Sequence, residues 1–308
     1  MKALPLFYYP TTIAWLDDDN LFLTSAQKCF GENQQVKPFA HPNDCLQFFK
    51  HYQSLLSNLN FMRAGVEYEN YDAPEHLPID LNIEAFAQLR EHPARYQEIS
   101  VMIVDYHMPD MNGIELCRQL HYQPMKKILL TGEADQHQAV AAFNEGTIDC
   151  FLRKDSPTLV VDIQKHLQAL KQQYFYSYAN PLLLHLETEH QLALSDQAFI
   201  KFFKAWCEMH HIQEYYPMDK YGNLLVVDQH GKTSHFIIHT DYTLNAFTEL
   251  NGDEEEGAIL IQAVASRKKV PFFGIGKASW QCAVTDWDKY FYVPQVFEGR
   301  ERYYWVVV

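Results

Sequence analysis

The chain has 308 residues, 47% of them hydrophobic, with six cysteines and a formal net charge of −14 at pH 7. The negative charge repels the phosphates of nucleic acid and disfavours direct DNA binding. The sequence lacks an apolar run of about 18 residues that could cross a bilayer, and its cysteines are scattered without CxxC spacing, so we expect a cytoplasmic protein with reduced thiols and no membrane insertion.

The length of the chain favours two domains, and the first begins with an alternation of short apolar runs and helical patterns. Its predicted elements are a strand at 13–16, a helix at 21–29, a strand at 36–40 and a helix that begins near Pro42. Residues 58–98 then lose this regularity, because they contain three prolines and one helical pattern, at 83–89. We interpret residues 58–98 as an insertion in the first domain.

Regular alternation resumes at residue 101. The further predicted elements are a strand at 101–104, a helix at 113–120, a strand at 127–131, a helix at 136–144 and a strand at 150–154. Continuously apolar strands are typical of a parallel sheet covered on both faces. Five strands with helices between them predict a doubly wound α/β domain of the (βα)5 type over residues 10–173. A helix with Pro157 in its first turn is expected to close this domain and to lead into a helical linker at 174–190.

The second half of the chain has the pattern of an α+β domain at 191–308. We expect a helix from Ser195, a β-meander of three strands joined by turns, two further helices and two final strands. The predicted ranges are 212–218, 223–228 and 235–240 for the meander, 244–250 and 255–267 for the helices, and 290–297 and 302–308 for the last strands.

Side chains with chemical function follow four of the predicted strands. They are Asp17, Asp18 and Asp19 after the first strand, Asp105 after the central strand, and Thr131 and Lys154 at the ends of the last two. Because the carboxyl ends of parallel strands meet at one edge of a sheet, we expect these groups to converge. Clustered carboxylates repel one another, and a hard cation such as Mg²⁺ relieves that repulsion. Asp105 could then attack a phosphoryl group as a carboxylate nucleophile and form an acyl phosphate.

Four stretches around these residues resemble the receiver domains of two-component response regulators. They are Trp15-Leu16-Asp17-Asp18-Asp19, Ile103-Val104-Asp105-Tyr106-His107-Met108-Pro109-Asp110-Met111-Asn112-Gly113, Leu129-Leu130-Thr131-Gly132 and Phe151-Leu152-Arg153-Lys154. The resemblance covers residues 10–173 and implies that Asp105 is the phosphoacceptor. It implies that Mg²⁺ is held by Asp17, Asp18, Asp105 and the backbone carbonyl of His107. It also implies a switch hydroxyl, a switch aromatic and a phosphate-pairing lysine, which are Thr131, Phe151 and Lys154.

Two features depart from the family pattern. The insertion precedes the phosphorylated strand, and Asp155 stands where the family usually has proline after the lysine. Arg153 is adjacent to Lys154, so a change of register by one residue would exchange the two cations. The position of Phe151, three residues before Lys154, favours Lys154.

The resemblance implies a regulator and not an enzyme, phosphorylated by a sensor histidine kinase, a phosphotransfer protein or a small phosphodonor. Phosphorylation is expected to promote a homodimer or to change the interactions of the second, output domain. The layout also resembles a quorum-sensing response regulator, which implies a membrane-bound kinase that answers a small diffusible signal. An alternative stays open, in which the receiver controls an enzymatic or nucleotide-sensing output domain. A cleft with convergent titratable side chains would favour that alternative.

Overall fold

The structure is a computed structural model that describes residues 4–30, 34–64, 79–132, 135–185, 192–219, 222–275, 277 and 279–308. Two compact units divide the chain, and neither is contiguous in sequence. The parallel-sheet unit comprises Tyr9–Leu59 and Leu89–Tyr178, and the antiparallel-sheet unit comprises Met1–Tyr8, Asn60–Gln88 and Ala179–Val308. None of the helices in the described part of the chain combines the length and apolar character needed to cross a bilayer.

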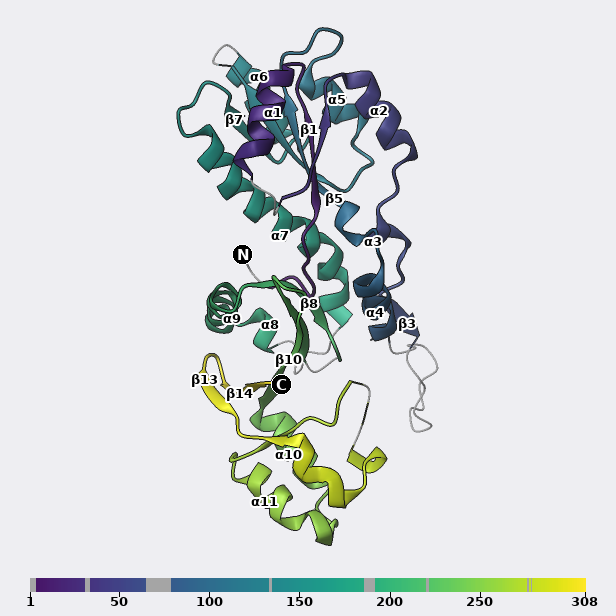
Figure 1. Cartoon of the computed structure of the whole chain (residues 1–308), viewed down its shortest axis with the longest axis vertical. Coiled ribbons are helices and arrows are strands. Elements are labelled where there is room, and N and C mark those ends of the chain that lie inside the picture. The colour runs from purple at the N-terminus through teal and green to yellow at the C-terminus, as the bar shows by residue number, and fades with distance from the viewer. Residues whose placement is uncertain are drawn as a thin grey trace. The chain divides into compact units, whose positions relative to one another are not determined.

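The parallel-sheet unit has five parallel strands in the order β2-β1-β5-β6-β7. Figure 1 labels β1, β5 and β7 of this sheet. The strands are β1 (Thr12–Leu16), β2 (Val36–Phe39), β5 (Ile99–Asp105), β6 (Lys126–Thr131) and β7 (Cys150–Arg153). The helices are α1 (Asn20–Cys29), α2 (Pro42–His51), α3 (Leu55–Asn58), α5 (Gly113–Gln119), α6 (Gln136–Asn144) and α7 (Leu159–His185), with a 3-10 turn, η1, at Arg95–Gln97. The predicted doubly wound α/β fold is therefore confirmed.

Both faces of this sheet are buried, which explains why its strands are continuously apolar. Successive side chains of a strand point to opposite faces. Ile13 and Trp15 pack in a cluster with α1 and α7, whereas Ala14 and Leu16 pack in a second cluster with α2, α5 and α6. All seven residues of β5 are buried. Burying a large apolar side chain contributes about 1.5–3 kcal/mol, so the central strand anchors the residues at its end.

The helix after β7 begins two residues later than expected. Pro157 precedes α7 instead of occupying its first turn, because the segment from Ser156 to Thr158 forms a hydrogen-bonded turn. Thr158 N donates to Ser156 Oγ over 3.3 Å, and Leu159 N donates to the Ser156 carbonyl over 3.1 Å. The division between the two units falls within α7, after Tyr178.

The antiparallel-sheet unit is built on five strands in the order β13-β14-β10-β9-β8. They are β8 (Ile212–Pro217), β9 (Leu224–Asp228), β10 (Thr233–Thr240), β13 (Gln295–Glu298) and β14 (Arg302–Val307). Its other elements are α8 (Leu192–Ser195), α9 (Gln197–Met209), α10 (Asp241–Leu250), α11 (Ala258–Ala265), η3 (Glu255–Gly257), η4 (Ser279–Gln281), η5 (Val284–Tyr290), β11 (Val270–Pro271) and β12 (Phe291–Tyr292). The predicted β-meander is confirmed, since β8, β9 and β10 pair in sequence as antiparallel neighbours.

The single strand predicted at 290–297 is wrong. The structure divides it into β12, which pairs with β11, and β13, which pairs with β14. Pro294 lies between them and has no N–H to donate to a neighbouring strand, so pairing is interrupted there.

Part of the predicted insertion packs in the antiparallel-sheet unit. It contributes β3 (Met62–Ala64), β4 (Ile79–Leu81) and most of α4 (Ile83–Glu91). The ring centroids of Phe7 and Phe61 are 5.3 Å apart, and those of Phe61 and Phe86 are 4.7 Å apart. Aromatic packing thus joins the N-terminal residues to the inserted segment. Residues 65–78 of the predicted insertion and 186–190 of the predicted linker lie outside the described residues.

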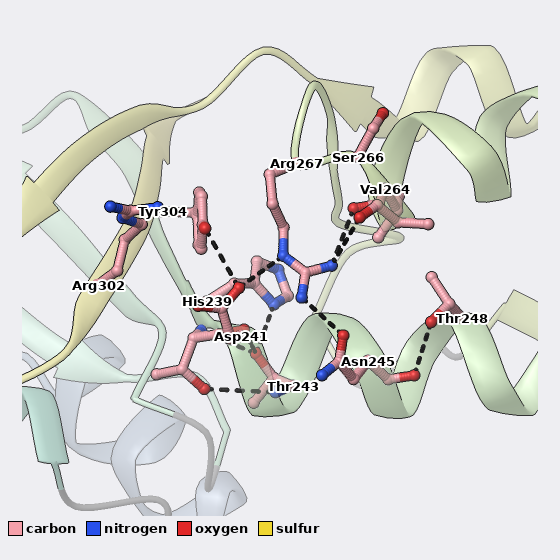
Figure 2. Close-up of polar contacts among 12 residues, drawn as sticks. His239, Asp241, Thr243, Asn245, Thr248, Val264, Ser266, Arg267, Arg302 and Tyr304 are labelled. Atoms are coloured by element: carbon pink, nitrogen blue, oxygen red, sulfur yellow. Dashed lines mark hydrogen bonds and ion pairs between the residues drawn. The ribbon is translucent and has the colours of Figure 1, made fainter.

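A polar cluster ties the start of α10 to the end of α11 (Figure 2). Arg267 Nε donates to Asp241 Oδ1 over 2.6 Å, and Arg267 Nη2 donates to Asn245 Oδ1 over 2.6 Å. Tyr304 on β14 also donates to Asp241 Oδ1, over 3.2 Å. Arg267 has a φ of 61°, the left-handed conformation that follows many helix ends, and its Nη1 donates to the Ala265 carbonyl of α11 over 3.1 Å. The cluster therefore acts as a structural clamp between helices.

Candidate functional site

Three of the predicted carboxylates converge at the carboxyl edge of the parallel sheet. Asp17 follows β1 and is fully buried, and Asp105 is the last residue of β5 and is also buried. Asp18 is exposed. One oxygen from each of these three carboxylates lies within 4.8 Å of the other two. The parallel topology thus brings together residues that are far apart in sequence.

The third acid of the triplet has a different position. Asp19 Oδ1 accepts hydrogen bonds from Leu21 N over 2.9 Å and from Phe22 N over 3.1 Å. It therefore caps the start of α1. Asp19 N donates to Asp17 Oδ1 over 3.0 Å, which holds the Asp17 carboxylate in place.

Lys154 joins the two buried carboxylates. Its Nζ donates to Asp105 Oδ2 over 2.8 Å and lies 2.8 Å from Asp17 Oδ2. The adjacent Arg153 pairs instead with Asp155, with 2.7 Å between Arg153 Nη2 and Asp155 Oδ2. Lys154 follows the last residue of β7, and its backbone N donates to the Thr131 carbonyl over 3.0 Å, which holds it beside the end of β6. The structure brings Lys154 to the cluster.

The electrostatics of this cluster oppose the ionisation of Asp17. Burial raises the pKa of the Asp17 carboxyl above its ordinary value, and the negative charge of Asp105 raises it further, although Lys154 and the Asp19 amide act in the opposite direction. Burial by itself would lower the pKa of Lys154, but its contacts with Asp105 and Asp17 raise it. One ammonium therefore stabilises carboxylates that would otherwise repel one another at close range.

The donor set fits Mg²⁺. This ion prefers hard oxygen ligands and is usually bound through one or two carboxylates with several waters. The cluster offers three carboxylates, two buried and one exposed to solvent. A pocket of about 470 Å³ adjoins it and is lined by Asp18, Tyr106, His107, Met108, Pro109 and Asn112. The loop that contains His107 thus borders the open side of the acidic cluster.

His107 also connects two loops at this edge. Its exposed side chain places Nε2 3.4 Å from Oδ2 of Asp135, which is buried and precedes α6. Asp135 was not predicted as a site residue, since no motif distinguishes it from other acids in the sequence. The one sequence feature that points to Asp135 is its position four residues after Thr131, beyond the end of β6.

Thr131 and Phe151 lie on neighbouring strands. Thr131 is fully buried, and its Oγ1 donates to the Gly132 carbonyl over 3.0 Å. Phe151 is half-buried and packs in the same cluster as Leu129, its partner in the register of β6 and β7. Leu129 and Thr131 are two residues apart and share a face of the sheet. Thr131 and Phe151 are therefore on the same side of neighbouring strands.

A glycine permits the close approach of α5 to this edge. Gly113 N donates to the Tyr106 carbonyl over 2.9 Å, and a Cβ at Gly113 would lie 2.3 Å from the Asp105 backbone oxygen. Asn112 caps α5 by accepting a hydrogen bond from Glu115 N over 2.9 Å. The turn after Asp105 is thus held by backbone contacts that no larger residue would allow at position 113.

Comparisons with known proteins agree with this geometry. A family model for the response regulator receiver domain matches residues 80–164. The transcriptional regulatory protein ResD of Bacillus subtilis is 27% identical over 195 residues, which are 56% of this chain and 78% of ResD. The response regulator ArlR of Staphylococcus saprophyticus is 27% identical over 94 residues, which are 30% of this chain and 39% of ArlR. The structure of the Legionella pneumophila response regulator LqsR is similar with a TM-score of 0.80 and 26% identity, over 99% of this chain and 88% of LqsR.

Proposed function

Because this chain carries the receiver domain of a two-component response regulator, we propose that it accepts a phosphoryl group on Asp105 and that this modification changes how its molecules associate. The observation that carries the proposal is the contact of Lys154 Nζ with both Asp105 and Asp17 at the carboxyl edge of the sheet. A sensor histidine kinase, a phosphotransfer protein or a small phosphodonor supplies the phosphoryl group.

The chemistry needs a carboxylate nucleophile and charge neutralisation around it. An Asp105 oxygen forms a bond to phosphorus while the bond from phosphorus to the donor breaks, and the product is an acyl phosphate. When bound by Asp17, Asp18, Asp105 and the His107 carbonyl, Mg²⁺ would neutralise the carboxylates and the oxygens of the incoming group. Lys154 pairs with a phosphoryl oxygen, and its distance to Asp105 Oδ2 of 2.8 Å supports this role.

We expect Asp18→Ala to weaken Mg²⁺ binding by at least about tenfold, the smallest loss typical of changes around a metal site. Asp18 is exposed, so its removal should leave the fold intact. Asp19→Ala is the matched control, because Asp19 caps α1 and should cost stability of about 1 kcal/mol without changing the metal affinity. Isothermal titration calorimetry with Mg²⁺ measures the metal affinity of both variants. An unchanged affinity in Asp18→Ala would count against the metal site.

The output step that we propose begins at Thr131. Its hydroxyl now donates to the Gly132 carbonyl, and a phosphoryl oxygen on Asp105 would compete for this donor. An inward shift of Thr131 would leave space for Phe151 on the same side of the neighbouring strand. This local change would reshape the surface of α6, β7 and α7. The surface would thus have one shape in the unphosphorylated protein and another in the phosphorylated protein.

This surface has the apolar character of an interface. Its exposed apolar side chains are Val140 and Phe143 on α6 and Val160 and Val161 on α7. Phe143 lies beside Phe151, with ring centroids 6.3 Å apart, so a movement of Phe151 would be transmitted to the exposed ring. We propose that two copies of the surface pair about a two-fold axis, as self-complementary interfaces do.

We expect phosphorylation to strengthen this dimer by about 1–3 kcal/mol, the usual scale of coupling between sites. Thr131→Ala should still be phosphorylated on Asp105 but should lose most of this gain, whereas Thr131→Ser retains the hydroxyl and serves as the control. Sedimentation equilibrium with and without acetyl phosphate measures the association. If the wild-type protein shows the same monomer–dimer equilibrium in both states, the dimer proposal is wrong.

We propose that the signal for phosphorylation comes from quorum sensing. A membrane-bound histidine kinase would respond to a small diffusible molecule and pass the phosphoryl group to this protein. Support comes from the layout of a receiver followed by an α+β output region and from the similarity to the response regulator LqsR over 99% of this chain. Transfer of radiolabelled phosphate from candidate kinases to the wild-type protein, compared with Asp105→Asn, would identify the cognate kinase.

A further inference from the structure

A second polar pocket lies in the parallel-sheet unit, near the beginning of β6. It has a volume of about 330 Å³. Its lining comes from the end of α5 and the turn after it, from Lys127, and from residues 145–147 between α6 and β7. Thr131 is at the other end of β6, so this pocket is separate from the acidic cluster along the length of the strand.

Lys127 lines this pocket and is a largely buried residue whose ammonium group has no direct ion-pair partner among the described residues. The residue is only 7% exposed. In the described part of the chain, its ammonium group makes no hydrogen bond or ion pair. Asp149, the nearby acid, accepts a hydrogen bond from the Lys127 backbone N over 2.8 Å and one from Lys126 Nζ over 3.1 Å. The charge of Lys127 is thus offset only through space by Asp149, which is already paired with Lys126, and a ligand anion in the pocket would pair with Lys127 directly.

The other groups that line the pocket do not supply that partner. Arg118 Nη2 and Glu145 Oε2 pair with each other at 3.0 Å, and both side chains are more than half exposed. Burial raises the pKa of the Cys117 thiol to about 12, so the thiol is neutral at physiological pH. Because Arg118 and Glu145 balance each other, Lys127 adds a positive charge that no acid of the lining balances.

The size and charge of the pocket define its ligand. We propose that the pocket binds a small organic acid whose carboxylate pairs with Lys127 Nζ. A single excess positive charge matches a carboxylate, and the volume of about 330 Å³ leaves room for an organic group beyond it. The Thr147 hydroxyl and the His121 ring also line the pocket and can hydrogen-bond to the ligand.

The state of the Lys127 amine agrees with this assignment. Burial lowers its pKa below the ordinary value for lysine, and the negative charge of the nearby Asp149 opposes this shift only in part. A carboxylate in contact with Nζ would favour the charged form and raise the pKa again. Ligand binding and protonation of Lys127 are therefore coupled.

Acetate is the probe for the test, with amide chemical shifts of the full chain as the measurement. In the wild-type protein, acetate should produce saturable shifts at Gly146 and Thr147 that sodium chloride of equal ionic strength does not produce. Lys127→Met should weaken this binding at least roughly tenfold, because it removes a charge-assisted hydrogen bond. Lys165→Met is the control with the same change of side chain, because Lys165 is exposed on α7 and does not line the pocket, and this variant should bind acetate like the wild type.

The variant is expected to fold, since methionine replaces a buried unpaired charge with an apolar group of similar length. Equal acetate shifts in Lys127→Met and wild type would overturn the proposal, and so would shifts that chloride reproduces. Tighter binding of inorganic phosphate than of acetate would overturn the assignment of a carboxylate. Saturable acetate binding that depends on Lys127 and not on Lys165 would support it.

Discussion

Asp105→Asn is expected to abolish phosphorylation of this protein by acetyl phosphate. The substitution keeps the size of the side chain but replaces the nucleophilic carboxylate with an amide, which does not form an acyl phosphate by this route. Asp105 is the buried last residue of the central strand and lies 2.8 Å from Lys154 Nζ, so the other acids near the site do not replace it.

Asp110→Asn is the matched control for this prediction. Asp110 is exposed and lies in the loop that follows Asp105, so the variant changes the charge near the site by the same amount. It should be phosphorylated like the wild type. Gels that retard phosphoproteins, and occupancy by beryllofluoride, report the outcome. Undiminished labelling of Asp105→Asn would refute the assignment of the phosphoacceptor.

Lys154→Met is expected to destabilise the parallel-sheet unit by about 3 kcal/mol in Mg²⁺-free buffer, because it leaves buried carboxylates without their cation. Asp17 is fully buried, and 7% of the Asp105 side chain is exposed. Arg153→Met is the control, since it breaks an exposed ion pair with Asp155 and should cost at most about 1 kcal/mol. Urea unfolding followed by circular dichroism and calorimetry compares the two variants.

The pH dependence of this effect has a defined sign. Burial already raises the pKa of Asp17, and loss of the Lys154 ammonium should raise it further. A carboxyl whose pKa is higher in the folded state than in the unfolded state destabilises the fold once it ionises. The deficit of Lys154→Met should therefore grow as the pH rises through the raised pKa and shrink in acid. Added Mg²⁺ should also reduce it. Equal stability of Lys154→Met and Arg153→Met at neutral pH would contradict the prediction.

Local patterns in the sequence are sufficient to predict the fold of the parallel-sheet unit and the residues at its carboxyl edge. Apolar runs that alternate with helical periodicity encode strands and helices locally, and the doubly wound order follows from that alternation. Asp17, Asp105 and Lys154 were identified because parallel strands bring their carboxyl ends together, and the structure brings these three side chains into contact. Their roles in phosphorylation stay predictions.

Which of two adjacent cations reaches a given acid depends on the packing of the assembled fold. A change of register by one residue would exchange Arg153 and Lys154, and the position of Phe151 favours Lys154 but does not fix where either side chain points. The adjacent lysines 126 and 127 carry the same charge. In the structure, Lys126 pairs with Asp149, whereas Lys127 is buried beside a pocket. The sequence specifies the charge of a side chain. The direction in which that side chain points depends on strand pairing and on the segments that pack around it.

Tertiary packing also decided which segments form each unit. Phe7, Phe61 and Phe86 are far apart in the chain, yet their rings pack together in the antiparallel-sheet unit. Local periodicity identified the helix that contains Phe86, but it carries no information on which distant apolar surface that helix covers. The physical reason is that burial of apolar area is non-directional, so the partners of an apolar face are chosen by the assembled fold and not by the pattern of the segment itself.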